Sequence, residues 1–282
     1  MMDKIDSLET DNGPILVATD LRPQSDRAID RAIMTADAQD VGLIVFHVIE
    51  EGSRLAATPE RTDAAVRSVL PDPAAAVEIR TAEGSAPSKI VEAAEVNGCS
   101  LIVTGVARFN SLGDSFIGTA VERVVRKAAQ PVLVVKQRPR ANYRNMVAAT
   151  DFSACSRYAL LTAARLFPEA KLHVFHAFHV AYEGFVNIEL NVDDVRAEVQ
   201  SEFDDFLNDP VIPDEIRRRV TSHLEYGDTQ GVADQLVDKL EADLVVIGTH
   251  GRSGFSKAVF GSIAEMLLRS VPVDTLVVRE PV

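Results

Sequence analysis

The stretch Asp243–Ser262, DLVVIGTHGRSGFSKAVFGS, carries the clearest structural signal in this chain. Its residues Leu244–Ile247 form a short apolar run rich in β-branched side chains, which is typical of a parallel strand buried on both faces. Glycines then punctuate the segment that follows, at Gly248, Gly251, Gly254 and Gly261. Ser262 begins a run whose apolar residues recur at helical spacing. The predicted order is strand, glycine-rich loop and helix.

The glycine-rich loop has the chemistry of a phosphate site, because backbone N–H groups at a loop and helix start attract anions. Gly248 and Gly251 would let the backbone approach a ligand with no Cβ between them. Gly261–Ser262 would add N–H donors and a hydroxyl at the helix cap. Neither the P-loop pattern nor the dinucleotide fingerprint G-x-G-x-x-G is present. A glycine-rich turn without a ligand remains the alternative.

The chain also contains an internal repeat. Ile15–Ile29, ILVATDLRPQSDRAI, returns as MVAATDFSACSRYAL from Met146, which places Asp151 where Asp20 stands. The apolar run ending at Gly105 returns as the run ending at Gly248, and from there an offset of 143 residues holds without a gap. The boundary falls in the polar stretch 137–145, which suits a linker. We therefore expect a disordered lead-in over 1–13, a first domain over 14–138 and a second over 144–282.

Each repeat alternates strands and helices, which predicts an α/β fold with a parallel sheet covered on both faces. In the first repeat the predicted strands are residues 15–19, 43–49, 77–81, 101–104 and 132–135. Helices are predicted around residues 25–33, 58–70, 87–96 and 119–129. The expected architecture is two tandem doubly wound five-stranded parallel-sheet domains, with ligands bound outside the carboxyl ends of the strands. The apolar last strands, Val132–Val135 and Leu276–Val278, could pair between the repeats or between chains.

Composition narrows the functional classes. The chain has 282 residues, 46% of them hydrophobic and 25% charged, which is ordinary for a globular protein. Its formal charge of −13 argues against nucleic acid and anionic membrane surfaces as partners. No apolar run approaches the roughly 20 residues that span a bilayer, and the polar, acidic N-terminus is unlike a signal peptide. We expect a cytoplasmic protein.

The spacing Gly248-x2-Gly251-x9-Gly261-Ser262, directly after an apolar strand, resembles the ATP-binding motif of the universal stress protein family. The resemblance covers residues 14–282. It implies the strand order 3-2-1-4-5 and two halves packed as a pseudo-dimer. It also implies binding of ATP, possibly with Mg, or of ADP, in a stress-response regulator that acts on an unknown protein partner. A homodimer of the tandem chain is a further possibility.

The resemblance also assigns site residues. Asp151 is expected to contact the nucleotide, although an Asx-turn is the structural alternative for this residue. The backbone near Ala177 is expected to read adenine. Phosphates are expected at Gly248, Gly251, Gly261 and Ser262. Four other loop residues could meet phosphate charge or simply be solvated: His250, Arg252, Ser253 and Lys257.

The first repeat departs from the motif, because Arg108 stands where Gly251 stands in the second. An arginine there would block the pocket or occupy it as an internal cation, and it could pair with Asp20. We therefore expect the first site to be empty or to hold a different ligand.

The remaining candidates are weaker. His173, His176 and His179 suggest a metal, but alternation along a strand places His176 on the opposite face from the other two. His176 and its counterpart His47 are better interpreted as packed core histidines, while His173 and His179 stay open as metal ligands. Cys155 precedes a helix, where its thiol pKa could fall. The acidic segment 193–205 predicts a solvated helix over a packed apolar stripe.

No Ser-His-Asp order, metal-ligand spacing or carboxylate pair around a scissile bond is evident, so a fast enzyme is not expected. A slow ATPase or nucleotidyl-transfer enzyme, with Asp151 and a divalent ion at its centre, is the alternative. A scaffold that has lost nucleotide binding is the third hypothesis, and the intact glycine set of the second repeat argues against it.

Overall fold

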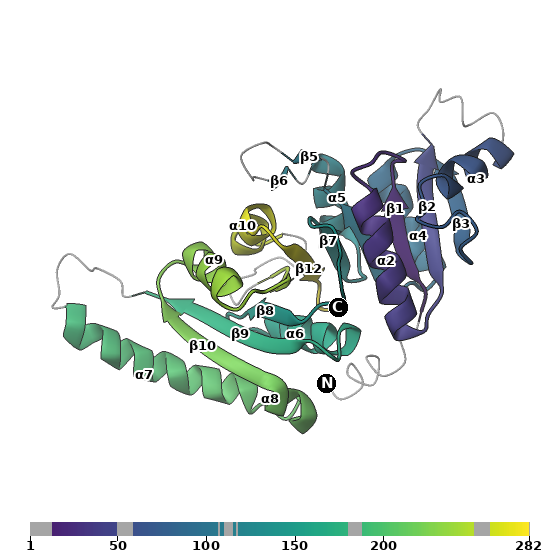
Figure 1. Cartoon of the computed structure of the whole chain (residues 1–282). Helices are drawn as coiled ribbons and strands as arrows, with labels where there is room; N and C mark the ends of the chain where they lie inside the picture. Colours follow the sequence, from purple (N-terminus) through teal and green to yellow (C-terminus); the bar gives the residue numbers. More distant parts are fainter. Residues whose placement is uncertain are drawn as a thin grey trace. The chain divides into compact units, whose positions relative to one another are not determined.

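The computed structural model describes residues 13–49, 59–106, 108–109, 115–116, 118–179, 188–250 and 260–281. The chain divides into two compact units (Figure 1). Among the described residues, unit 1 comprises 13–142 and 272–281, and unit 2 comprises 143–271. Within these residues, no helix combines the length and the apolar composition that crossing a bilayer requires.

Unit 1 contains the first repeat and the last strand of the second. Its strands are β1 (Ile15–Thr19), β2 (Leu43–Ile49), β3 (Glu78–Glu83), β4 (Leu101–Gly105), β5 (Arg108–Phe109), β6 (Ser115–Phe116), β7 (Val132–Val135) and β12 (Asp274–Val278). Its helices are α2 (Asp26–Gln39), α3 (Pro59–Arg67), α4 (Ala86–Val96) and α5 (Thr119–Lys127). The main sheet has the order β3-β2-β1-β4-β7-β12, which confirms the predicted 3-2-1-4-5 arrangement for the first repeat.

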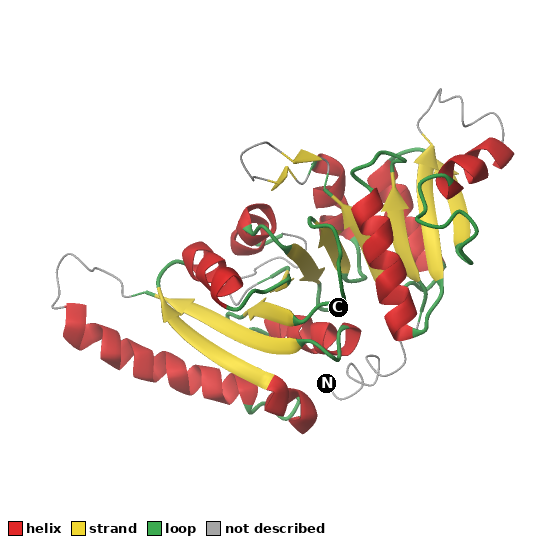
Figure 2. Ribbon diagram, in the orientation of Figure 1, coloured by secondary structure: helices red, strands yellow, loops and turns green. Residues whose placement is uncertain are grey.

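The sheet of unit 1 is the core of a doubly wound layer structure. All five residues of β1 are buried, because helices cover both faces of this central strand. Helix α2 packs against β1 and β4, while α4 and α5 pack against each other behind the strands (Figures 1 and 2). The C-terminal ends of the parallel strands are thus left at one edge, where ligands of such folds bind.

The last strand of the chain, β12, belongs to unit 1. Strand β12 pairs antiparallel with β7, with Leu276 opposite Leu133 and Thr275 opposite Val134. The pairing takes place between the two repeats, one of the two possibilities that the sequence left open. All five residues of β12 are buried, including Asp274.

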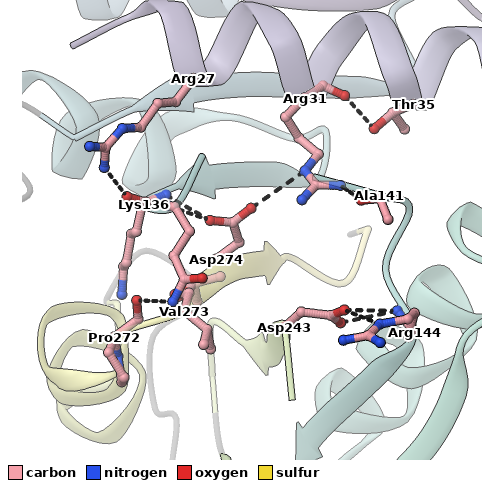
Figure 3. A network of polar contacts seen from close by, with 12 residues as sticks. Arg27, Arg31, Thr35, Lys136, Ala141, Arg144, Asp243, Pro272, Val273 and Asp274 are labelled. Atoms are coloured by element: carbon pink, nitrogen blue, oxygen red, sulfur yellow. Dashed lines mark hydrogen bonds and ion pairs between the residues drawn. The ribbon is translucent and has the colours of Figure 1, made fainter. Parts of the chain in front are cut away.

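A buried polar network holds β12 beside β7 (Figure 3). The carboxylate Oδ1 of Asp274 accepts the backbone N–H groups of Lys136 and Gln137 at 2.8 and 2.9 Å. Its Oδ2 lies 3.6 Å from Nε of Arg31 in α2, and this ion pair is almost fully buried. Burial lowers the pKa of Lys136 to about 7, against the opposing attraction of Asp274. Arg31 also donates to the carbonyl of Ala141 at 2.9 Å.

Unit 2 repeats the same plan with four strands. Its strands are β8 (Asn145–Ala149), β9 (Lys171–Phe178), β10 (Val220–Tyr226) and β11 (Leu244–Gly248). Its helices are α6 (Ala154–Leu166), α7 (Ile188–Leu207), α8 (Asp214–Arg219), α9 (Thr229–Lys239) and α10 (Ser262–Ser270). The sheet order is β10-β9-β8-β11, all parallel, which reproduces 3-2-1-4 of the predicted arrangement.

Helices again cover both faces of the sheet in unit 2. Helix α6 packs on β11 and β8, and α7 packs on β9, while α9 and α10 pack together and contact β8, β9 and β11. The acidic helix predicted over 193–205 is α7. In its apolar stripe Phe203 and Phe206 are 0% and 3% exposed, whereas Val195 and Val199 are half-buried.

Candidate functional site

The candidate site lies at the carboxyl edge of the unit 2 sheet. Strand β9, which follows β8 in the chain, lies on one side of β8, and β11 lies on the other side. The strand order therefore reverses between β8 and β11. In doubly wound sheets, ligands bind at this switch point. Asp151 follows β8, Gly248 ends β11, and Ala177 is the last residue but one of β9. The structure thus brings these three predicted residues to one edge.

Asp151 is part of a tightly hydrogen-bonded corner. Its Oδ1 accepts the backbone N–H of Ser153 at 3.2 Å, so the Asx-turn that we considered as the alternative is present. The preceding Thr150 accepts the N–H of Phe152 on its hydroxyl at 2.9 Å. Phe152 has φ 63°, in the left-handed region. The corner therefore has little freedom to move the Asp151 carboxylate.

His176 fixes this corner from β9. Its Nδ1 lies 2.7 Å from the carbonyl oxygen of Thr150. Because a carbonyl only accepts, Nδ1 carries the proton and donates it. His47 makes the same contact in the first repeat, with Nδ1 2.9 Å from the carbonyl of Thr19. The interpretation of both histidines as structural residues is supported, and their repeated role is to hold the turn after the first strand.

The two corners have the same backbone conformation but differ in the hydrogen-bond partner of an equivalent serine. In the first repeat Leu21 has φ 60°, matching Phe152. There Ser25 Oγ donates to the carboxylate of Asp20 at 2.5 Å. In the second repeat the equivalent Ser156 Oγ lies 2.9 Å from the hydroxyl of Thr150 instead. The serine that binds the aspartate in unit 1 therefore binds the threonine in unit 2.

The ends of the glycine-rich loop meet at the sheet edge. The N–H of Gly261, the N-cap residue of α10, donates to the carbonyl of Thr249 at 2.9 Å. A Cβ at Gly261 would lie 3.3 Å from this same carbonyl oxygen. Ser262 follows as the first, exposed residue of α10. His250 Nδ1 lies 2.7 Å from the hydroxyl of Thr249, which is buried. The start of α10 is thereby held beside the end of β11.

Gly248 has a packing role that the sequence pattern did not indicate. A Cβ there would lie 3.0 Å from Sγ of Cys155 and 3.2 Å from its carbonyl carbon and oxygen. Gly105 plays the same part in the first repeat, where a Cβ would lie 3.2 Å from the carbonyl oxygen of Gln24. Both glycines let the fourth strand approach the start of the first helix. Cys155, which is buried and forms no disulfide, lies at this contact.

The middle of the loop lies outside the described residues, and with it the predicted positions Gly251, Arg252, Ser253 and Lys257. The described site residues are therefore Asp151, Ala177, Gly248, His250, Gly261 and Ser262. The corner residues Thr150, Phe152 and His176 were not predicted as part of the site. The available signal was the repeated pair of a Thr-Asp strand end and a histidine in the next strand.

The described parts of the equivalent segment in the first repeat are a short ladder and the start of α5. Arg108–Phe109 pair antiparallel with Ser115–Phe116 as a short two-stranded ladder. Gly118, the N-cap of α5, has φ 81°, whereas Gly261 has φ −64°. The structure does not describe the side chain of Arg108. The partners that it shows for the Asp20 carboxylate are Ser25 Oγ, the N–H of Arg22 and, at 3.8 Å, Nε of Arg22.

His173, which the sequence left open as a metal ligand together with His179, contacts His223 instead. His173 Nδ1 lies 3.1 Å from Nε2 of His223 on the neighbouring strand β10, while His179 is exposed beyond the end of β9. Burial and the adjacent His223 lower the pKa of His173. Burial also lowers the pKa of His223, against the opposing effect of Glu225. Among the described residues, no group of three or more His, Cys, Asp or Glu side chains could hold a metal.

Comparisons with known proteins agree with this architecture. The model of the universal stress protein family matches residues 12–136 and again residues 142–279. Universal stress protein A homolog 1 from Coxiella burnetii is 30% identical over 145 residues, covering 49% of this chain and 96% of that protein. Universal stress protein E from Salmonella typhi is 23% identical over 220 residues, covering 72% of this chain and 68% of that protein.

A solved structure from Pseudomonas aeruginosa PAO1, of a functionally unknown protein, has a similar fold over almost its whole length. It superimposes with a TM-score of 0.66 at 22% identity, covering 95% of this chain and 92% of that chain. At this identity the likeness bears on the fold alone. The two matches of the family model together span most of the chain. The chain therefore belongs to the universal stress protein family, with one family domain in each repeat.

Proposed function

We propose that this chain binds ATP in its second repeat and acts as a nucleotide-dependent regulator of a stress response. Nucleotide binding is typical of the family, whose solved members include one in complex with cAMP and one, from Archaeoglobus fulgidus, in complex with dAMP. The observation that carries the proposal is the Gly261–Thr249 hydrogen bond. It holds the N-terminus of α10 beside the end of β11, where phosphate would meet the N–H groups of the first turn of the helix.

In this proposal the described residues take distinct roles. Asp151 contacts the nucleotide, and the backbone near Ala177 meets the base. The N–H groups around Gly248 and Ser262 meet the phosphates, together with the loop residues Gly251, Arg252 and His250. Gly261 sets the start of α10 through its hydrogen bond to Thr249 and lets the phosphates approach closely. A magnesium ion bound with the triphosphate would lower the repulsion between its charges and the carboxylate of Asp151.

The first repeat is proposed not to share this role. Its aspartate is already engaged by Ser25 at 2.5 Å, and its loop forms the β5–β6 ladder. Regulation would then depend on one occupied site per chain. ATP would act by favouring one conformation of the site, which requires different affinities for the two conformations. A protein partner would respond to the conformation that ATP stabilises.

The first experiment identifies what the protein carries. The full chain is purified without added nucleotide and denatured, and the released compounds are identified and quantified by chromatography and mass spectrometry. About one ATP or ADP per chain supports the proposal. Two per chain would contradict the expectation for the first repeat, and none, followed by no heat on titration with Mg-ATP, would refute ATP binding.

A matched pair of variants tests the position of the site. Gly251→Arg copies Arg108 into the second repeat and should abolish Mg-ATP binding while the far-UV circular dichroism stays unchanged. Arg108→Gly makes the reverse change in the first repeat and should leave one ATP per chain. Unchanged ATP affinity in Gly251→Arg would show that another loop binds the phosphates.

A further inference from the structure

We propose that ATP binding at Asp151 is energetically coupled to the packing of helix α7, and that Phe152 is the positioning residue that couples them. This inference rests on the proposed ATP site of the second repeat. It assigns a role to a residue outside the predicted motif and to a helix that supplies none of the proposed phosphate ligands.

The first observation is the backbone of Phe152. The residue directly follows Asp151 and has φ 63°, a conformation that bulky side chains rarely adopt. Such a conformation persists only where the surrounding contacts determine it. The contacts of the Phe152 side chain therefore also determine where the carboxylate of Asp151 points.

The second observation is what those contacts are. The Phe152 ring stacks on His176 with centroids 4.3 Å apart and planes 27° from parallel. The same ring meets those of Phe203 and Phe206 in α7, with centroids 5.4 and 5.8 Å away. Phe152 is 8% exposed. One ring thus joins the histidine that fixes the corner to the inner face of α7.

The third observation is a set of contacts between the C-terminal end of α7 and helix α6, which begins beside Asp151. Arg157 in α6 forms an ion pair with Asp209, just beyond α7, at 3.1 Å. Its guanidinium also lies over the Phe206 ring, 5.3 Å from the centroid. Helix α6 has Ser153 as its N-cap, the residue whose N–H binds Asp151. Displacement of α7 would therefore disturb both sides of the Asp151 corner.

The first repeat lacks this arrangement. Leu21 adopts the same left-handed backbone but carries no aromatic ring, and the helix between the second and third strands has 9 residues, against 20 in α7. The aromatic anchor thus occurs in the repeat whose glycine motif is complete. A ligand that prefers the ordered Asp151 corner would favour packed α7, and packed α7 would favour the ligand by the same factor.

The test uses the full chain, Mg-ATP calorimetry and hydrogen exchange of the α7 amides with and without ATP. Phe152→Leu copies Leu21, and Phe206→Leu removes the ring on the α7 side. Each should weaken ATP binding about fivefold or more, the lower end of typical coupling. In the wild-type chain ATP should slow exchange in α7, and both variants should lose that slowing.

Phe167→Leu is the matched control, because Phe167 is buried in unit 2 against Tyr143, with ring centroids 4.8 Å apart, away from Asp151. It should lower thermal stability and leave ATP affinity within twofold. Wild-type affinity in Phe206→Leu, or ATP binding that leaves α7 exchange unchanged, refutes the coupling alone. Absence of ATP binding to the wild-type chain refutes the proposed site and the coupling with it.

Discussion

Replacing Asp274 by alanine should strongly destabilise unit 1. The carboxylate is 1% exposed and accepts two backbone N–H groups, at 2.8 and 2.9 Å, from the end of β7. It also faces the buried guanidinium of Arg31 at 3.6 Å. The substitution would leave the buried N–H of Lys136 and the partly buried N–H of Gln137 without this acceptor, and it would remove the opposite charge from Arg31.

The magnitude follows from those contacts. A hydrogen bond to a charged acceptor contributes about 1.5–3 kcal/mol. Removing one partner of a buried ion pair costs about 3–5 kcal/mol. Because both losses describe the same carboxylate, they overlap, and we expect the free energy of unfolding to fall by about 3–5 kcal/mol. Asp274→Asn keeps an acceptor oxygen and should cost clearly less.

Urea unfolding followed by far-UV circular dichroism measures these changes. The matched control is Asp243→Ala in unit 2, where the carboxylate also accepts two backbone N–H groups, from Arg144 and Asn145 at 3.0–3.2 Å, but is 27% exposed (Figure 3). Water can replace the lost partner there, so the control should cost less than Asp274→Ala. A loss below about 1 kcal/mol for Asp274→Ala, or equal losses for both alanine variants, would refute the reasoning.

Three further predictions concern buried groups. The pKa of Lys136 is lowered from 10.5 to about 7, so between these pH values the unfolded chain binds one proton more than the folded chain. The free energy of unfolding should therefore rise with pH in this range, by at most about 1.4 kcal/mol per pH unit from this group. Lys136→Met should remove that rise, as measured by urea unfolding across pH 7–10. The pKa values of His173 and His223 are lowered from 6.5, so the unfolded chain takes up protons first as pH falls below 6.5. Wild-type stability should therefore decrease there, and a double replacement by glutamine should lessen the decrease; equal acid sensitivity would contradict this. Gly248→Ala should lower the melting temperature, because its Cβ meets Cys155 Sγ at 3.0 Å, and adding Cys155→Ala should recover part of the loss.

The strands and the repeat were predictable from the sequence because their signals are local. Buried parallel strands are continuous apolar runs, so the expected strand 132–135 is β7 residue for residue. Edge strands have a weaker pattern, which is why β3 begins and ends slightly later than predicted, at Glu78–Glu83. The copy of the Thr-Asp strand end in both repeats also located the two corners correctly.

The contacts that connect distant segments were not predictable in the same way. Asp274 is the first residue of β12, and nothing local in the sequence indicates that its partners are Lys136 and Arg31. Likewise, His223 lies 50 residues from His173, and only strand pairing makes them neighbours. Side-chain alternation correctly separated His176 from His173, whereas the choice of His179 as a partner assumed a strand that continues past Phe178.

The position of β12 in the sequence affects how the protein folds during translation. Strand β7 is complete by residue 135, but its antiparallel neighbour is Asp274–Val278, near the end of the chain. On the ribosome, the β7 edge of the first repeat therefore stays unpaired while more than a hundred further residues are translated. A gene fragment cut at the linker would leave β7 as a bare apolar edge, which invites aggregation. The first repeat therefore depends on a strand that is encoded at the end of the second, and fragments for biochemical study should keep residues 272–281.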